Sequence, residues 1–349
     1  MKKKIRYAHL LKFVKEILFK VNLDRFSIDS VATGLCETTL RGVDSHGVRL
    51  LPHYVRSALM GRKNPRPSFK FKKTFPAIGV LDADNGFGHA AGLKAIEHCI
   101  KLAKKNGIGV VAVKNSSHPG AMATMALKAA RKGYISFAFT HADSLLLSHN
   151  GTRPYFGTNP ICVAVPRVEK EPYCLDMATS MISWNKLLTF KEQGKLLSRG
   201  LAANKKGQPT INPNLAKSLI GAGSYKGYGL ASVVEILCGI YTGMAFGRSI
   251  PRMYNSPIRK PRKLGQFYIV LRIDGCINRI NFFKRMQSLS NQVRNEPKRS
   301  KQKVMLPNDI EIKKTKDQLK NGVVLSDEVF KKFMQLSKKY SIKLNLINQ

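Results

Sequence analysis

Apolar residues recur at helical spacing through the first forty positions of the chain. They stand at positions 10, 11, 13, 14, 17 and 18, and the polar break Asn22-Leu23-Asp24 interrupts the pattern. Recurrence at this spacing indicates amphipathic helices, so we expect two helices between residues 7 and 40. A third helix is expected from about Leu51 to Met60, because Gly61 and the cluster Asn64-Pro65-Arg66-Pro67 would end it.

Short apolar runs then alternate with helical patterns, which is the order of an α/β fold. The expected elements are strands over 77–82, 108–113 and 135–140 and helices over 92–105 and 121–132. Asn106-Gly107 is a helix stop, and the β-branched run after it predicts a buried strand. We therefore predict an α/β fold in which at least some strands are parallel.

The second half of the chain predicts further elements of both kinds. These are strands over 161–165, around Leu175 and over 267–271, and helices over 226–241, 281–293 and 326–340. The helix over 281–293 has Phe282, Phe283, Met286 and Leu289 on one face. Residues 296–303 are charged and predict an exposed loop, and no internal repeat is visible.

Bulk composition is that of an ordinary globular protein. The chain has 349 residues, of which 43% are hydrophobic, so it can bury a core large enough for two domains. It contains no run of 18 apolar residues, so we predict no membrane span, and Met1-Lys2-Lys3-Lys4 does not continue as a secretory signal. The six cysteines form no C-x-x-C pair, which predicts reduced thiols in a cytoplasmic protein.

The net charge of +39 suggests a nucleic-acid partner, but its distribution argues against a specific one. Between Thr74 and Ser180 there are 11 lysines and arginines against 7 aspartates and glutamates, so most of the excess lies elsewhere. The basic residues are scattered, and no zinc-finger, RNP or helix-turn-helix signature accompanies them. A lysine-rich solvated surface is the simpler interpretation, and its positive field would also attract anionic substrates.

Four segments carry residue types that suit chemistry. In the segment 41–54, His46 lies between turn-forming residues, and a histidine there can exchange a proton near neutral pH without a metal. Asp44 or Ser45 would tune this histidine. The other three segments are 115–121, which contains His118, 156–160 and 225–230.

These four segments, in this order and at these separations, resemble the malate/L-lactate dehydrogenase family, which includes ureidoglycolate dehydrogenase and diketogulonate reductase. Supporting matches lie at residues 81–84, 175–179, 245–248 and 264–267, and the resemblance covers about residues 30–335. It implies an NAD(P)-dependent enzyme that is a homodimer with a non-Rossmann cofactor fold. The glycines at 86, 88 and 92 have G-x-G-x-x-x-G spacing, so we interpret them as a loop and helix start and not as a dinucleotide fingerprint.

The resemblance also implies the catalytic residues. Reduction of a 2-oxo acid needs an acid to protonate the oxygen, and the family match places both His46 and His118 in the active site. We favour His46, with His118 as the alternative. Tyr54 and Asp143 match positions that line the family pocket, and Asp143 would polarise a histidine or bind the substrate hydroxyl.

The carboxylate of the substrate needs a cation, for which Arg49 is the candidate. Many members of the family carry the arginine one residue later, where this chain has Leu50. A shift of one residue on a helix turns a side chain by about 100°, so Arg56 and Arg153 remain alternatives.

The candidate cofactor contacts come from three of the matching segments. Residues 157–160 offer backbone donors and a hydroxyl, residues 176–178 a carboxylate, and residues 226–227 a lysine at a helix start. Such groups suit the phosphates and ribose hydroxyls of a dinucleotide. These residues are Gly157, Thr158, Asn159, Pro160, Asp176, Met177, Ala178, Lys226 and Gly227. We predict no metal site, because the histidines show no i, i+4 pair and no cysteine pair supports them.

The predicted protein is an NAD(P)-dependent 2-hydroxy-acid dehydrogenase that acts on a malate-, lactate- or ureidoglycolate-type substrate. Residues 75–255 would form the non-Rossmann NAD(P)-binding α/β domain, and residues 1–74 with 256–349 a second domain for substrate and dimer contacts. A cofactor-binding protein that has lost catalysis and a basic protein that binds nucleic acid non-specifically are the alternatives.

Overall fold

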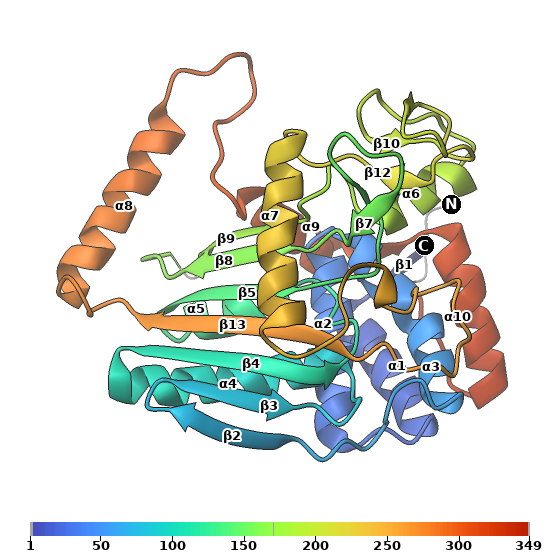
Figure 1. Cartoon of the computed structure of the whole chain (residues 1–349), viewed down its shortest axis with the longest axis horizontal. Helices are drawn as coiled ribbons and strands as arrows, with labels where there is room; N and C mark the ends of the chain where they lie inside the picture. Colours follow the sequence, from blue (N-terminus) through green and yellow to red (C-terminus); the bar gives the residue numbers. More distant parts are fainter. Residues whose placement is uncertain (1–2, 170, 348–349) are drawn as a thin grey trace.

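A seven-stranded mixed sheet forms the centre of the molecule (Figure 1), in the order β2-β3-β4-β13-β5-β8-β9. The computed structural model describes residues 3–169 and 171–347. The strands of this sheet are β2 (Lys70–Phe75), β3 (Ile78–Asp82), β4 (Ile108–Ser116), β5 (Tyr134–Thr140), β8 (Ile161–Val165), β9 (Tyr173–Met177) and β13 (Leu264–Arg272). β3 and β4 are parallel and the other neighbours are antiparallel, so an α/β fold with partial parallel pairing is confirmed.

Strand β13 corrects the predicted division of the chain. It lies between β4 and β5 in the middle of the sheet and pairs with both. The boundary predicted at residue 256 is therefore wrong for residues 264–272, which belong to the same sheet as residues 108–116. The strand itself was predicted, but pairing between strands far apart in sequence leaves no local pattern.

One face of the sheet is covered by the helices α4 (Gly88–Asn106) and α5 (Ala123–Ala130). Small side chains of these helices and apolar residues of the strands form a common core. The C-terminus of α4 is capped by Gly107 in the left-handed conformation, with φ of 78°. The helix stop and the strand predicted after it are both confirmed.

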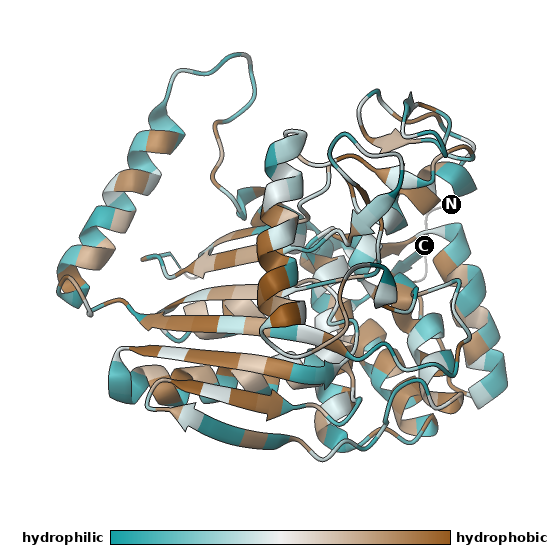
Figure 2. Ribbon diagram, viewed as in Figure 1, coloured by the Kyte–Doolittle hydropathy of each residue, from teal (hydrophilic) through white to brown (hydrophobic). Residues whose placement is uncertain are grey.

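The opposite face carries α7 (Tyr225–Glu235), which lies across the strands in Figure 1 and continues as a π-helical turn, η3 (Ile236–Ile240). The predicted helix over 226–241 is confirmed in extent, although its last turn is wider than an α-helix. Figure 2 shows brown, apolar residues on this helix and on the strands that face the viewer.

The two ends of the described chain meet beside the sheet. Strand β1 (Lys3–Ile5) pairs with β14 (Val323–Leu325), and residues from both ends share one apolar core. The helices that surround this core are α1 (Tyr7–Lys20), α2 (Arg25–Leu40), α3 (Leu51–Leu59), α9 (Asp309–Asn321) and α10 (Asp327–Tyr340). The helices predicted over 7–40, 51–60 and 326–340 are confirmed.

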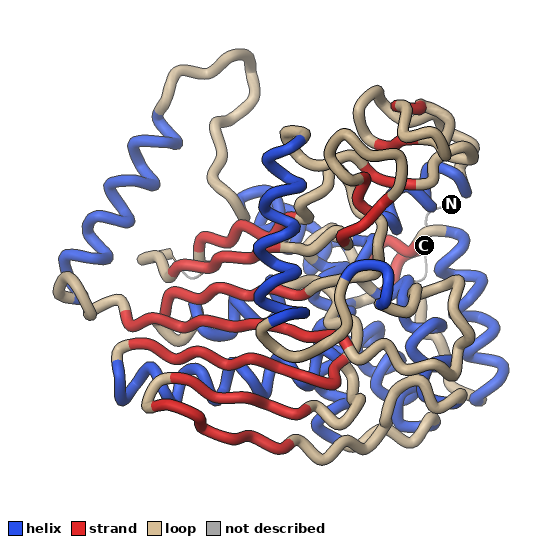
Figure 3. Tube along the Cα trace, viewed as in Figure 1, coloured by secondary structure: helices blue, strands red, loops and turns tan. Residues whose placement is uncertain are grey.

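Residues 181–224, largely drawn as loop in Figure 3, build a part of the molecule that the pattern did not predict. A five-stranded sheet has the order β11-β10-β12-β6-β7 and packs beside α6 (Trp184–Glu192). Its strands are β6 (Leu146–Leu147), β7 (Pro154–Phe156), β10 (Ala202–Ala203), β11 (Pro209–Thr210) and β12 (Ser218–Leu219). Strands this short carry no readable alternation.

Helix α8 (Arg279–Asn295) extends away from the body of the molecule in Figure 1, and the predicted loop that follows it is exposed. None of the helices in residues 3–169 and 171–347 is long and apolar enough to cross a membrane.

Candidate active site

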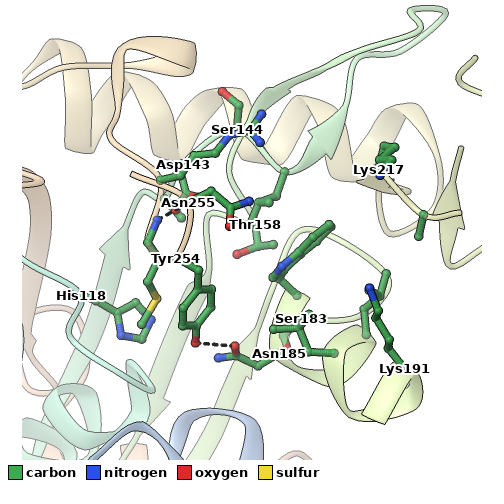
Figure 4. A pocket seen from close by; sticks show the side chains of 18 of the residues that line it. His118, Asp143, Ser144, Thr158, Ser183, Asn185, Lys191, Lys217, Tyr254 and Asn255 are labelled. Carbon is green, nitrogen blue, oxygen red and sulfur yellow. Dashed lines mark hydrogen bonds between the residues drawn. The ribbon is translucent and has the colours of Figure 1, made fainter. Parts of the chain in front are cut away.

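A cavity of about 410 Å³ lies between the sheet, the terminal helices and α6. Its walls come from several chain segments, most of them distant in sequence (Figure 4). The lining includes His46, His118, Asp143, Thr158, Trp184, Asn185, Lys191, Lys217, Arg252, Tyr254, Asn255 and Arg262. Of the five predicted catalytic residues, His46, His118 and Asp143 line this cavity, and Tyr54 lies directly behind it.

The two candidate histidines lie side by side. The rings of His46 and His118 are stacked, with centroids 5.6 Å apart and planes inclined by 22°. His46 is on a short 3-10 helix, η1 (Asp44–His46), and its Nδ1 atom is 2.9 Å from the hydroxyl of Ser45. Of the two neighbours expected to tune His46, the contact is therefore with Ser45. Burial and the nearby Arg49 lower the pKa of His46 to about 4, so this ring is neutral at pH 7.

Gly47 allows the close packing that holds this turn. A Cβ atom there would lie 2.0 Å from the side-chain oxygen of Thr39, which accepts a hydrogen bond from the Val48 amide. The atom that approaches this glycine most closely thus belongs to α2.

His118 is held from behind by Tyr54. The Tyr54 hydroxyl is 2.8 Å from His118 Nδ1 and 3.2 Å from the His118 carbonyl oxygen. Burial lowers the pKa of His118 well below its usual value, so this ring is also neutral. Within the part of the chain that the structure describes, no hydrogen bond engages the Nε2 atom of His46 or His118, which leaves both for a ligand.

Asp143 pairs with an arginine and not with a histidine, which corrects one of its two predicted roles. Its carboxylate binds Nη2 of Arg262 and accepts a 3.4 Å hydrogen bond from the Met253 amide. Arg262 also donates from Nε to the Pro251 carbonyl oxygen at 2.9 Å. Its Nη1 atom has no hydrogen-bond partner among residues 3–169 and 171–347, although the residue lines the cavity. Arg262 is the main functional candidate that the sequence did not reveal, because it lies in a run of basic residues.

Arg49 does not line the cavity, so its assignment as the carboxylate clamp is corrected. Its guanidinium donates to the Asn185 carbonyl oxygen at 3.1 Å and the Thr189 hydroxyl at 2.7 Å, and it forms an ion pair with Glu192 at 3.2 Å. All three partners are on α6. The offset of one residue turns the side chain toward α6, where it joins this helix to the loop that carries His46.

The other predicted arginines are also absent from the cavity. Arg56 is exposed on α3, and Arg153 is exposed before β7. Neither is among the residues that line the cavity wall. The cation for a carboxylate must therefore come from another segment of the chain.

The three predicted cofactor segments lie together. Thr158, which lines the cavity, accepts a hydrogen bond from the Thr179 amide at 2.9 Å through its carbonyl oxygen. The Thr179 carbonyl oxygen in turn accepts from the Ala222 amide at 2.9 Å, just before α7. Gly227 packs against the same two residues, because a Cβ atom there would lie 2.4 Å from the Thr179 oxygen and from the Ala222 nitrogen. Thr179 and Ala222, which lie next to the predicted residues, thus connect the segments 157–160, 176–178 and 226–227.

The side chain of Asn159 has a structural role. Its side chain is fully buried and accepts from the Ala142 amide at 3.0 Å. The amide group donates to the Ala231 carbonyl oxygen at 2.9 Å and to Glu235 at 2.7 Å. Gly157 packs against the main chain of Ala142, since a Cβ atom on Gly157 would be 2.4 Å from the Ala142 carbonyl oxygen. The Asn159 side chain therefore braces the loop and does not face the cavity.

Asp176 and Lys226 differ in their surroundings. The Asp176 carboxylate accepts a hydrogen bond from the Ala123 amide at 2.8 Å, at the first turn of α5, and burial raises its pKa to about 6. Lys226 is exposed in the first turn of α7. Met177 and Ala178 are half-buried at the end of β9, and Pro160 is half-buried before β8.

Helix α6 contributes cavity residues that no sequence pattern indicated. Figure 4 shows Tyr254 pointing toward Asn185, whose side-chain oxygen accepts from the Tyr254 hydroxyl at 2.9 Å. Asn185 also donates to the Ser45 carbonyl oxygen at 2.8 Å, which ties α6 to the turn of His46. Lys191 and Lys217 lie on the side of the cavity away from His118. The described residues contain no group of histidines, cysteines or carboxylates that could hold a metal ion.

Comparisons with known proteins show which family this chain resembles. Residues 5–334 match the malate/L-lactate dehydrogenase family. A ureidoglycolate dehydrogenase (NAD(+)) from Escherichia coli strain K12 is 33% identical over 268 residues, which cover 77% of this chain and 76% of that protein. A malate dehydrogenase from Pyrococcus abyssi is 31% identical over 345 residues, or 96% of this chain and 94% of that protein.

A solved structure shows the same fold over the whole length. The malate dehydrogenase from Entamoeba histolytica superposes with a TM-score of 0.93 at 27% identity and covers 99% of both chains.

Proposed function

This chain belongs to the malate/L-lactate dehydrogenase family, and we propose that it transfers a hydride between NAD or NADP and a small 2-oxo or 2-hydroxy acid at the cavity of His46 and His118. The observation that carries the site is the pair of stacked, neutral histidines in a cavity that Arg262 and Thr158 also line. The cofactor domain would be of a non-Rossmann type, in keeping with a largely antiparallel sheet and no G-x-G-x-x-G turn.

His118 is the better supported proton donor, although the sequence alone favoured His46. When Tyr54 donates to Nδ1 of His118, the neutral ring carries its proton on Nε2, where a substrate oxygen can accept it. When Nδ1 of His118 carries the proton and donates to the Tyr54 oxygen, Nε2 is unprotonated and can accept the proton of a hydroxy acid. His46 is stacked beside this ring and would orient the same oxygen.

Arg262 is the proposed partner of the substrate carboxylate. Two of its guanidinium nitrogens are held by Asp143 and by the Pro251 carbonyl oxygen, so the third has a defined direction. A guanidinium held in this way binds a carboxylate with little loss of side-chain freedom. Asp143 then serves to fix Arg262 and to balance its charge.

The joined segments 157–160, 176–178 and 226–227 are the proposed cofactor contacts. When bound, the nicotinamide ring supplies or receives the hydride. Thr158 would contact the cofactor from the cavity wall, and Lys226 at the N-terminus of α7 would hold phosphate. Lys226→Ala should then weaken cofactor binding by about 1–3 kcal/mol, whereas Lys101→Ala, an exposed lysine on α4, should not change it.

The single tryptophan gives a direct measurement of binding. Trp184 is the only tryptophan of the chain and lines the cavity, so its fluorescence reports on bound cofactor. We expect NADH or NADPH to quench it. No change with either cofactor would argue against binding at this cavity.

Turnover tests the chemistry. A panel of 2-oxo acids with NADH or NADPH, followed by nicotinamide absorbance, should identify a substrate. His118→Ala should lower kcat by about 10²–10⁴ with cofactor binding retained, and His9→Ala, an exposed histidine on α1, should leave it unchanged. Near-native turnover of His118→Ala would move proton transfer to His46. Cofactor binding without turnover of any acid would support the catalytically impaired alternative.

We also propose that the chain forms a homodimer through the face of the sheet that carries α7. Exposed apolar residues follow this helix and η3, including Leu230, Val233, Ile236, Ile240 and Tyr241. Several strand residues packed against this helix are only partly buried, and Figure 2 colours much of the helix and of the strands beside it as hydrophobic. A continuous apolar surface of this kind is typical of a subunit interface.

Sedimentation of matched variants tests the dimer. Val233→Glu places a charge in the exposed stripe and should give a monomer of 38.9 kDa. Val324→Glu makes the same change at an exposed valine of β14 and should remain a dimer. A monomeric wild type would refute the proposal.

The six unpaired cysteines support a cytoplasmic location.

A further inference from the structure

A buried lysine lies behind the proposed proton donor. Lys63 follows α3, is 2% exposed and has its amide bonded to the Ser57 carbonyl oxygen at 3.2 Å. Its Nζ atom has no hydrogen-bond partner and no carboxylate within ion-pair distance among the residues that the structure describes. Lysines are almost never fully buried unless they are paired, so this position requires an explanation.

The amino group lies over two aromatic rings. Nζ is 3.7 Å from the ring centroid of Tyr54 and 4.6 Å from that of Phe87. A cation over the face of a tyrosine ring is attracted to it and stabilises negative charge on the phenol oxygen. That oxygen is the one that contacts His118 Nδ1 at 2.8 Å. Lys63 is therefore one aromatic ring away from the histidine of the cavity.

The groups that face Lys63 are mostly cations and neutral rings. Burial is the main cause that lowers the pKa of Lys63 well below its usual value, and Arg262 and Arg62 add to it. The titratable groups around it also include His53 on α3, His89 on α4, and His118 on the loop after β4, and each has a pKa lowered by Lys63. Asp143 faces Arg262 and not Lys63. Lys63 thus has no carboxylate counterion among the described residues, and a negative charge on the Tyr54 oxygen would supply one.

His89 completes the cluster without accepting a hydrogen bond from the lysine. Its ring is fully buried, and neither nitrogen has a partner in residues 3–169 and 171–347. It lies edge-on to Tyr54, with centroids 5.8 Å apart. Gly34 and Gly120 make room for it, since a Cβ atom on either would approach within 2.4 Å of the ring. The rings of Tyr54 and Phe87 are therefore the groups over which the Lys63 amino group lies.

We propose that Lys63 is a positioning residue for proton transfer at His118 and that it acts through the hydroxyl of Tyr54. This proposal rests on the proposed function. As His118 gives its Nε2 proton to the substrate oxygen, Tyr54 gives its own proton to Nδ1, and the ring of His118 stays neutral. Burial raises the pKa of Tyr54, so the negative charge that forms on its oxygen requires stabilisation, which the Lys63 ammonium over the ring supplies. After product release, solvent in the cavity returns one proton to His118 Nε2 and Nδ1 gives its proton back to Tyr54, so each reduction consumes one hydride and one proton.

A double-mutant cycle tests whether Lys63 acts through Tyr54. Lys63→Met removes the charge and keeps the length of the side chain, and Tyr54→Phe removes the hydroxyl. We expect Lys63→Met to lower kcat for 2-oxo acid reduction about 10-fold, with unchanged cofactor binding by Trp184 fluorescence. In the Tyr54→Phe background it should have no further effect, because the oxygen through which it acts is gone. Additive losses would overturn the proposal.

The pH profile separates positioning from packing. The wild type should lose reductive kcat as the pH rises through the lowered pKa of Lys63, and Lys63→Met and Lys63→Gln should lack this limb. Phe87→Leu is the matched control, since it changes the packing around Lys63 without changing a charge, and it should keep the limb. Both Lys63 variants should fold, because removal of an unpaired buried cation is not expected to destabilise the protein. An identical limb in wild type and both variants would overturn the proposal.

Nitrogen-15 NMR of histidine-labelled protein shows whether Lys63 acts on the tautomer of His118, even where no substrate is found. At pH 6 the wild type should carry the His118 proton on Nε2, and Lys63→Met should shift the population toward Nδ1–H. An unchanged tautomer would refute the role of Lys63, whatever the outcome of the substrate panel. Absence of turnover with the expected tautomer shift would contradict the proposed function and leave the positioning role supported.

Discussion

Asn159 was predicted to contact the cofactor, and the structure instead makes it an internal brace. Asn159→Ala should therefore cost stability and not cofactor affinity. The change removes two hydrogen bonds to main-chain groups, which contribute about 1 kcal/mol each, and one to the Glu235 carboxylate, which contributes about 2 kcal/mol, so the expected loss is about 4 kcal/mol. Over 349 residues this corresponds to a fall in Tm of about 5 °C.

Two measurements on the same protein decide between brace and ligand. Differential scanning fluorimetry gives the change in Tm, and quenching of Trp184 gives the cofactor Kd. Thr158→Ala is the matched control, because Thr158 is the neighbour that lines the cavity and its hydroxyl has no partner in the described chain. It should hold its Tm within about 1 °C and bind cofactor less tightly. An Asn159→Ala protein with wild-type Tm and a tenfold weaker cofactor Kd would refute the reasoning.

Arg262→Ala should lower kcat/KM for the oxo acid by at least about 100-fold, as expected for a lost charge-assisted bond to a carboxylate. Arg49→Ala should change kcat/KM only a few-fold. Equal losses in steady-state kinetics of the two variants would contradict the assignment of Arg262 as the partner of the substrate carboxylate. Burial lowers the pKa of His89 to about 3, so the unfolded chain takes up a proton below about pH 6.5 that the folded chain does not. From pH 7 to 5 the wild type should then lose about 2 kcal/mol more stability than His89→Leu, and parallel urea midpoints in the two proteins would contradict this. Binding to unrelated DNA sequences should fall steeply from 50 to 200 mM salt and ignore NAD(P)H; sequence preference at physiological salt would revive a nucleic-acid function.

The sequence by itself determined most of the local structure. Elements with a strong period or a capped end were found near their observed bounds, as for the helices over 7–40 and the run from Asn106-Gly107 into β4. Local propensity, period and caps act within a few residues, so they can be read without knowing the fold. The matching segments likewise indicated His46, His118 and Tyr54, which the structure brings together.

Tertiary structure decided which side chains face the cavity. Arg49 and Arg262 are both arginines in basic surroundings, and only the packing of α6 and the partner Asp143 separate them. Asn159 lies in a matching segment but turns inward to Glu235. Strand β13 lies between β4 and β5 in the sheet. Its residue Gly265 is nevertheless 125 residues after Thr140, the last residue of β5. Contacts of this kind depend on where distant segments of the chain meet, so they cannot be predicted from a local sequence pattern.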